Sequence, residues 1–180
     1  MTWRVAPIAA AVLVAIAATT LLSPRRGEDG SRPLWHEVAW PFAMDQWGKG
    51  KAYRCEPADC GTEVQLYLRS KLGSCDCAAG VADDEALDRM SDLDLVGSAS
   101  PLAAGRLVAI GHMKGRSRVY AFNARSPFGN GAIAIAFSDR CDMIVATAVL
   151  QDRGAVAASD VVAFLNSEAV SRWIEQAVGL

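Results

Sequence analysis

The sequence predicts an α+β domain in which an antiparallel β-sheet packs against helices, preceded by one N-terminal apolar segment. Short apolar runs in the second half of the chain are separated by turn-rich segments of hairpin length, which favours antiparallel pairing. Residues 159–178 form a long amphipathic segment that predicts a C-terminal helix over the sheet. The chain is 52% hydrophobic and 21% charged, which supplies a core and excludes intrinsic disorder.

The N-terminus has the profile of an export signal. Residues 5–22 carry no charge and follow Arg4, and an A-x-A pattern at residues 15–17 offers a cleavage site. Residues 1–22 are predicted to be either a removed signal peptide or a retained membrane anchor, because 18 uncharged residues just reach the roughly 17 to 25 that span a bilayer. Three arginines within residues 25–32 favour a cytoplasmic location for the rest of the chain. In our interpretation, the cluster of cysteines after residue 54 outweighs them.

A linker and one folded domain are predicted to come after this segment. Residues 23–33 are rich in glycine, proline, serine and charge, a composition typical of a flexible linker. Residues 34–180 are predicted to form a single exported domain, because this length fits one core and contains no internal repeat.

The first half of the domain is predicted to consist of short strands. Residues 34–42 are aromatic and end near a proline, which predicts an extended segment at the edge of a sheet. Residues 51–55 predict a short strand, and residues 56–61 predict a loop because proline, aspartate and glycine favour turns. Residues 62–72 alternate apolar and polar side chains, which predicts a half-buried strand.

The second half is predicted to contain a helix, two pairs of strands and the C-terminal helix. Asp83 can cap a helix over residues 83–92, in which the acidic run from Asp83 to Glu85 forms the first turn rather than a metal site. The C-terminal helix is expected to begin at Ser159 or Asp160. The four predicted strands cover residues 106–110, 118–123, 132–137 and 143–150.

The five cysteines are the strongest chemical signal. Four of them, Cys55, Cys60, Cys75 and Cys77, lie within 23 residues, and the fifth is Cys141. In an oxidising compartment such a cluster predicts two disulfides that hold the ends of loops. Cys75 and Cys77 are not expected to bond to each other, because a C-x-C ring is strained, so their partners are sought among the other three. The odd number leaves at least one thiol free or paired between molecules.

Two alternative hypotheses use the same cysteines. The thiolates of Cys55, Cys60, Cys75 and Cys77 could form a tetrahedral zinc or Cu(I) site, although the spacing lacks the usual two-residue knuckle. Thiol–disulfide exchange could use the Cys75–Cys77 pair, although the usual C-x-x-C motif is absent. Either would make the protein a periplasmic metal-handling or thiol-redox accessory protein.

Other functional signals are weaker. Lys114, Arg116 and Arg118 alternate, so in a strand they share one face that could contact an anion or a partner. A solvated strand face beside acidic residues is the plainer interpretation. The sequence contains no hydrolase, metalloprotease or phosphate-loop motif, which favours a non-enzymatic protein, and we predict no cofactor.

The charge and the tryptophans bear on possible partners. The formal net charge of −2 argues against nucleic-acid binding. Trp35, Trp40 and Trp47 come soon after the linker, and we expect one of them to lie at a binding surface because tryptophan favours interfaces. The sequence thus predicts a periplasmic or otherwise extracytoplasmic domain that binds a partner protein or assists a membrane complex. If the N-terminal helix is not cleaved, it would anchor the domain in the inner membrane.

Overall fold

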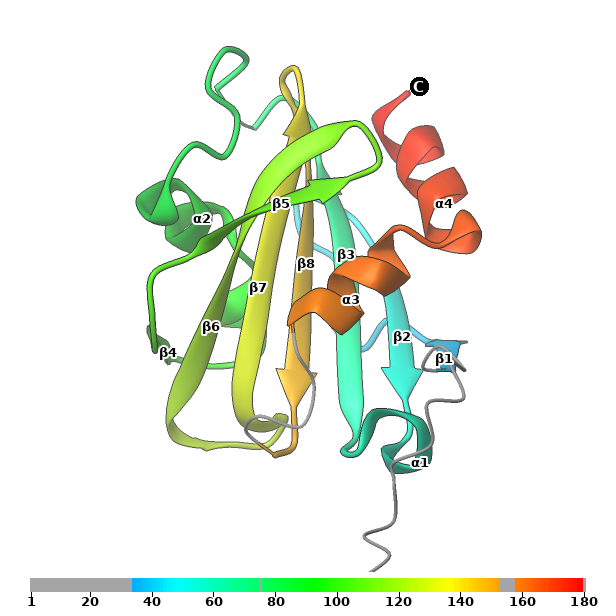
Figure 1. The fold of residues 1–180 in the computed structure, drawn as a ribbon, viewed down its shortest axis with the longest axis vertical. Helices are drawn as coiled ribbons and strands as arrows, with labels where there is room; N and C mark the ends of the chain where they lie inside the picture. Colours follow the sequence, from blue (N-terminus) through cyan, green and yellow to red (C-terminus); the bar gives the residue numbers. More distant parts are fainter. Residues whose placement is uncertain (1–33, 75, 153–157, 180) are drawn as a thin grey trace, which may run out of the picture. The chain divides into compact units, whose positions relative to one another are not determined.

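An eight-stranded antiparallel sheet forms the centre of the domain (Figure 1). The computed structural model describes residues 34–74, 76–152 and 158–179. The predicted signal or anchor, residues 1–22, and the predicted linker, residues 23–33, lie outside the described residues. Within the described ranges, no helix has the length and apolar character needed to cross a membrane.

The strands and helices confirm the predicted α+β class. The strands are β1 (Trp35–Val38), β2 (Lys51–Cys55), β3 (Val64–Lys71), β4 (Ala99–Pro101), β5 (Arg106–Ile110), β6 (Met113–Ser126), β7 (Gly129–Asp139) and β8 (Asp142–Leu150). The helices are α1 (Pro57–Cys60), α2 (Asp84–Met90), α3 (Ala158–Leu165) and α4 (Glu168–Val178), with a 3-10 turn, η1 (Leu93–Leu95). The strand order is β1-β2-β3-β8-β7-β6-β4, β5 pairs with β6, and every pair is antiparallel.

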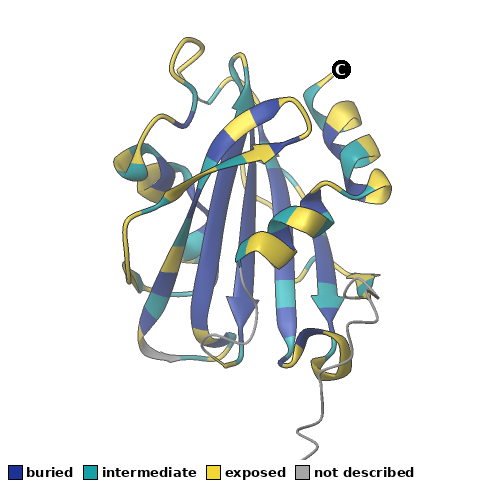
Figure 2. Ribbon diagram, in the orientation of Figure 1, coloured by how far each residue is buried: buried dark blue, intermediate teal, exposed yellow. Residues whose placement is uncertain are grey.

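Both faces of the sheet are covered (Figure 1). Alternate residues of β7 point to opposite sides, so that Ile135 joins the core beneath α3 and α4 while Ala136 joins the core beneath α2. The two C-terminal helices bury four side chains in their core: Val161, Leu165, Val170 and Ile174. In Figure 2 the central strands are almost entirely buried, whereas the outer sides of the helices are exposed. The domain is therefore a sheet between two covering layers.

The strand predicted as half-buried over residues 62–72 is instead buried on both faces. Its apolar residues, such as Leu66, lie in the core beneath α3 and α4. Arg69 and Lys71, on the opposite face, are buried as well. The alternation in the sequence therefore separates two buried faces, one apolar and one charged, because a second layer covers the face that was expected to meet solvent.

The single C-terminal helix predicted over residues 159–178 is two helices. Asn166 ends α3, where its side-chain Nδ2 donates to the carbonyl of Val162 at 2.9 Å and its Oδ1 accepts from the N–H of Gly111 at 2.8 Å. Ser167 has an extended backbone (φ −71°, ψ 152°) and precedes α4. Asparagine and serine favour helix ends over helix interiors, so the chain turns here and each short helix packs separately on the sheet.

Two local predictions are corrected and one is confirmed. The predicted loop 56–61 contains the one-turn helix α1, which has Pro57 in its first turn and ends at Gly61 in the left-handed region (φ 73°). β6 begins at Met113, five residues before the predicted strand 118–123, and leaves a turn of only two residues after β5. The short edge strand β4 was not predicted. The predicted cap of α2 is confirmed, because the Asp83 side chain accepts a hydrogen bond from the N–H of Ala86 at 2.8 Å.

Candidate functional site

Two disulfides form in the structure, which is typical of proteins outside the reducing cytoplasm. Cys55 and Cys60 are buried, and their bond ties the end of β2 to α1. Cys77 bonds to Cys141 and ties the exposed segment after β3 to the turn between β7 and β8. Cys75 lies outside the described residues. The prediction of disulfide bonds is confirmed.

The disulfides bear on the metal hypothesis. A thiolate site requires deprotonated, unbridged sulfur atoms. Three of the four proposed ligands, Cys55, Cys60 and Cys77, are held in disulfides in the structure. The hypothesis of a zinc or Cu(I) site at these residues therefore applies only to a reduced form of the protein.

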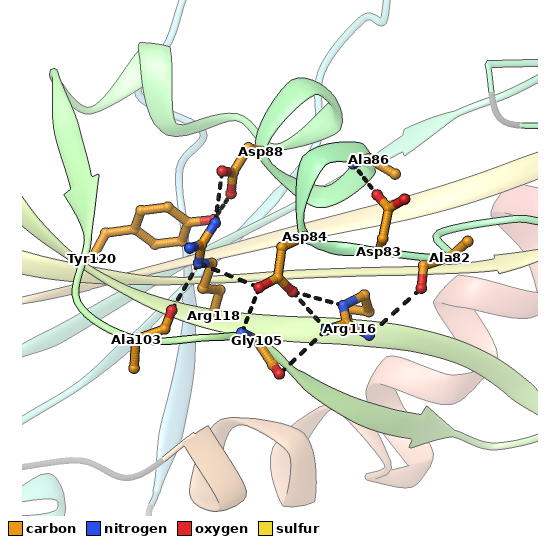
Figure 3. Close-up of polar contacts among 10 residues, drawn as sticks. All are labelled: Ala82, Asp83, Asp84, Ala86, Asp88, Ala103, Gly105, Arg116, Arg118 and Tyr120. Carbon is orange, nitrogen blue, oxygen red and sulfur yellow. Dashed lines mark hydrogen bonds and ion pairs between the residues drawn. The ribbon is translucent and has the colours of Figure 1, made fainter.

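Two of the three residues of the predicted anion-binding stripe form ion pairs within the protein (Figure 3). Arg116 donates to Asp84 Oδ1 from Nε at 2.9 Å and from Nη2 at 2.6 Å. Arg118 donates from Nη1 to Asp88 Oδ2 at 2.7 Å. The structure thus brings Arg116 and Arg118 together against α2, whereas Lys114 lines a separate hollow near the β7–β8 turn.

Asp84 is the centre of this network. Besides Arg116, it accepts a hydrogen bond at Oδ2 from the N–H of Gly105 at 2.8 Å (Figure 3). The Gly105 N–H, followed by the guanidinium of Arg116, holds the pKa of Asp84 below its ordinary value. The acidic run at the start of α2 therefore links the helix to β6 and to the segment before β5, in addition to starting the helix.

This lowered pKa predicts how acid affects stability. A carboxyl group whose pKa is lower in the folded state adds stability above its unfolded pKa of about 3.9, and this stability is lost as pH falls through the folded pKa. We expect Asp84→Asn to be less stable than wild type at neutral pH, and the difference to shrink as pH falls below about 4. Urea unfolding of both proteins, measured from neutral pH to below about pH 4, tests this prediction. Glu85→Gln is the control, and an Asp84→Asn deficit independent of pH would contradict the prediction.

A second network lies on the charged face of β3 and was not predicted. Arg69 forms a bidentate pair with Asp92, from Nε to Oδ2 at 2.9 Å and from Nη2 to Oδ1 at 2.6 Å. Lys71 Nζ lies 2.8 Å from the same Oδ1 and donates to the carbonyl of Met90 at 2.7 Å. The side chains of Arg69, Lys71 and Asp92 are only 4%, 9% and 5% exposed. The single negative charge of Asp92 therefore balances only part of the positive charge of Arg69 and Lys71. Asp45 supplies a second negative charge, with its Oδ2 2.5 Å from Arg69 Nη1.

Desolvation and these partners act on the pKa of Arg69 in opposite directions. Burial lowers the pKa, but the hydrogen bonds and charges of Asp92 and Asp45 outweigh burial and raise it above the ordinary value. The guanidinium therefore stays charged. Because Arg69, Lys71 and Asp92 satisfy one another inside the protein, we assign this network to stability rather than to ligand binding.

A hollow of about 510 Å³, which we call the aromatic groove, lies between the β1–β2 edge of the sheet and the C-terminal helices. Its lining includes four aromatic residues: Trp35, Tyr53, Phe164 and Trp173. Trp35 stacks on Phe164 with ring centroids 4.7 Å apart, and Tyr53 meets the same ring edge-on at 5.0 Å. The buried Trp35 Nε1 has no hydrogen-bond partner among the described residues. The surface of the groove is therefore formed largely by aromatic rings.

Of the three tryptophans considered as candidates for a binding surface, Trp35 is the one that lines the aromatic groove. Trp40 packs edge-on against Phe42 and Tyr67 on the opposite face of the sheet, and Trp47 lies over the ammonium of Lys71 at 5.8 Å from the ring centroid. Sequence reasoning could not find the groove, because its helical residues lie more than 100 positions from Trp35.

Comparisons of the chain with protein-family models, with curated proteins and with solved structures found no match, so its function is inferred from its own residues and geometry.

Proposed function

We propose that this protein is a periplasmic or otherwise extracytoplasmic domain, without enzymatic activity, that binds a partner protein through β1 and the aromatic groove. The partner would contribute an extended segment that adds to the sheet at β1 and inserts an apolar side chain among the aromatic rings. The observation that supports this most strongly is that the edge strand β1 and a hollow lined by four aromatic residues lie at the same edge of the sheet.

The backbone of β1 favours strand addition. β1 ends the sheet on its side, so its outer N–H and C=O groups face away from β2. Such an edge is a template for an added strand, which gains affinity from backbone hydrogen bonds and specificity from side-chain pockets. Near the opposite end of the sheet, by contrast, Asn166 bonds to backbone groups of Ala109 and Gly111 and so covers part of β5.

The side chains of the groove favour an apolar anchor with a polar backbone beside it. Tryptophan, tyrosine and arginine are the residues that most often dominate binding energy at protein interfaces. Trp173 is half-buried, and Arg172 beside it has an exposed side chain. The exposed guanidinium of Arg172 can donate to a carbonyl of the bound segment.

The position of the groove suits a partner at the membrane. The groove begins at Trp35, directly after the predicted linker 23–33. A linker of 11 residues spans at most about 40 Å. If residues 1–22 are retained as an anchor in the inner membrane, the groove would stay within reach of a membrane complex.

The second candidate function, a metal-handling or thiol-redox accessory protein, is favoured by one observation. Cys77 is exposed and its disulfide partner Cys141 is partly exposed, so a reducing partner could reach the bond. Buried Cys55 and Cys60 are protected by comparison. The aromatic groove has no part in this chemistry, and we therefore favour partner binding.

The binding proposal is tested with a library of random 12-residue peptides selected on the purified full chain. We expect the selected peptides to share a large apolar residue and to bind Trp173→Ala about 30-fold more weakly than wild type, the loss typical of a strong interface anchor. Trp47→Ala removes a tryptophan of similar exposure outside the groove and should bind as wild type does.

Two measurements separate loss of binding from loss of fold. Circular dichroism and the urea midpoint should show that Trp173→Ala stays folded under the binding conditions. Peptides that bind folded Trp173→Ala and wild type equally well, or a selection that yields no binders, would contradict the proposal.

A further inference from the structure

A hollow distinct from the aromatic groove lies where the β5–β6 turn, the β7–β8 turn and residues 77–82 meet. Its volume is about 400 Å³. Three of its lining residues carry basic side chains: His112, Lys114 and Arg140. We call it the basic hollow.

The walls of the basic hollow are held in place. The Cys77–Cys141 disulfide joins the segment that forms one wall to the turn that forms another. In the same segment Gly80 packs so closely that a Cβ there would lie 2.4 Å from Ser138 Oγ. Lys114 is paired with Ser138 across β6 and β7, which fixes its position in the sheet. A hollow with fixed walls binds with a smaller loss of conformational entropy than a mobile one.

Basic residues outnumber acidic ones in the lining of the basic hollow. Asp139 is its one acidic lining residue, and its Oδ2 lies 4.0 Å from His112 Nε2. Lys114, unlike Arg116 and Arg118 in the same strand, has no ion pair among the described residues. The positive charge of Lys114 is therefore available to a ligand.

Arg140 occupies a position that favours glycine. It is the first residue of the two-residue β7–β8 turn, and it is the one non-glycine residue with positive φ (52°) in the described part of the chain. Glycine is the usual residue where a hairpin turn begins with positive φ. An arginine there is strained, and observed strain at a hollow is a reason to look for a role of the side chain.

One wall of the hollow is apolar and open. Leu107 is 78% exposed, the most exposed of the large hydrophobic residues in the described ranges, and it lines the hollow together with Val81. A ligand with an apolar part would cover Leu107. The hollow therefore offers cations for one end of a molecule and apolar surface for the other.

We infer that the basic hollow binds a small organic phosphate, with the phosphate group between Lys114 and Arg140 and the apolar part against Leu107. A guanidinium matches two phosphate oxygens at once, and an ammonium adds a point charge. A phosphate group has three oxygens with which to contact both cations, whereas a carboxylate has two. This binding is independent of the aromatic groove.

The test uses the full-length protein and butyl phosphate as the probe, followed by amide NMR shifts and calorimetry at low salt. We expect saturable binding, with shifts at Gly80 and Gly115 in the hollow, and about tenfold weaker binding in both Arg140→Gly and Lys114→Met. Butyrate should bind more weakly than butyl phosphate. Lys49→Met removes an exposed lysine elsewhere and should bind as wild type does.

Glycine suits the positive φ at position 140, so Arg140→Gly keeps the backbone of the turn, and circular dichroism and the urea midpoint show whether the variant is folded before its affinity is compared. Displacement of butyl phosphate by phosphatidylglycerol vesicles, but not by phosphatidylcholine vesicles, would identify a lipid headgroup as the natural source, and the absence of displacement would identify a soluble phosphate. Absence of saturable binding, or equal affinity of folded Arg140→Gly and wild type, would overturn the inference.

Discussion

Replacing Asp92 with asparagine is expected to lower the free energy of unfolding by about 3–5 kcal/mol, the usual loss when one partner of a buried ion pair is removed. Asp92 pairs with both Arg69 and Lys71, and all three side chains are less than one-tenth exposed. Without the carboxylate, two buried cations retain only the charge of Asp45, which is 40% exposed. Urea unfolding at neutral pH measures the loss.

Asp94→Asn is the matched control, because Asp94 lies two residues further along and is exposed. We expect its free energy of unfolding to stay within about 0.5 kcal/mol of wild type. Similar values for the two variants would show that the buried network contributes little.

The second large effect on the free energy of unfolding is expected when the disulfide between Cys77 and Cys141 is removed. It joins residues 64 positions apart, whereas the Cys55–Cys60 bond joins residues 5 apart. In the chain-entropy model, a longer closed loop restricts the unfolded chain more. Replacing Cys77 and Cys141 with alanine should therefore lower the free energy of unfolding by about 4 kcal/mol, against about 2 kcal/mol for Cys55 and Cys60.

Both double variants are best compared in a Cys75→Ala background, which prevents Cys75 from forming new disulfides. Urea unfolding under non-reducing conditions gives the two values, and Cys75→Ala alone serves as the reference. A larger loss for the Cys55–Cys60 pair would show that packing around these buried sulfur atoms outweighs loop closure.

Structural features that depend on residues close together in the chain could be predicted from the sequence alone. The apolar runs that became β7 and β8 are separated by a short polar turn, and this local pattern predicts a buried hairpin. The cap of α2 was predicted for the same reason, since Asp83 and Ala86 are three positions apart. The break of the C-terminal helix is also local, but the signal from Asn166 and Ser167 is weak beside a continuous amphipathic pattern.

Features that depend on distant partners could not be predicted. Arg69 and Asp92 are 23 positions apart, and no local pattern shows that the face of β3 carrying Arg69 would be covered. Trp35 was recognised as one of three candidates for a binding surface, but its stacking partner Phe164 comes from near the other end of the chain. The aromatic groove is therefore a product of the tertiary fold.

The charged face of β3 also bears on how the strand finds its alignment. Because side chains alternate, sliding β3 by one residue between β2 and β8 would turn Arg69 toward Leu165 and the apolar core and would turn Leu68 toward Asp92. A guanidinium without a carboxylate in that core would be strongly unfavourable. We expect the network to exclude slipped pairings during folding, so that the central strands close in a single arrangement.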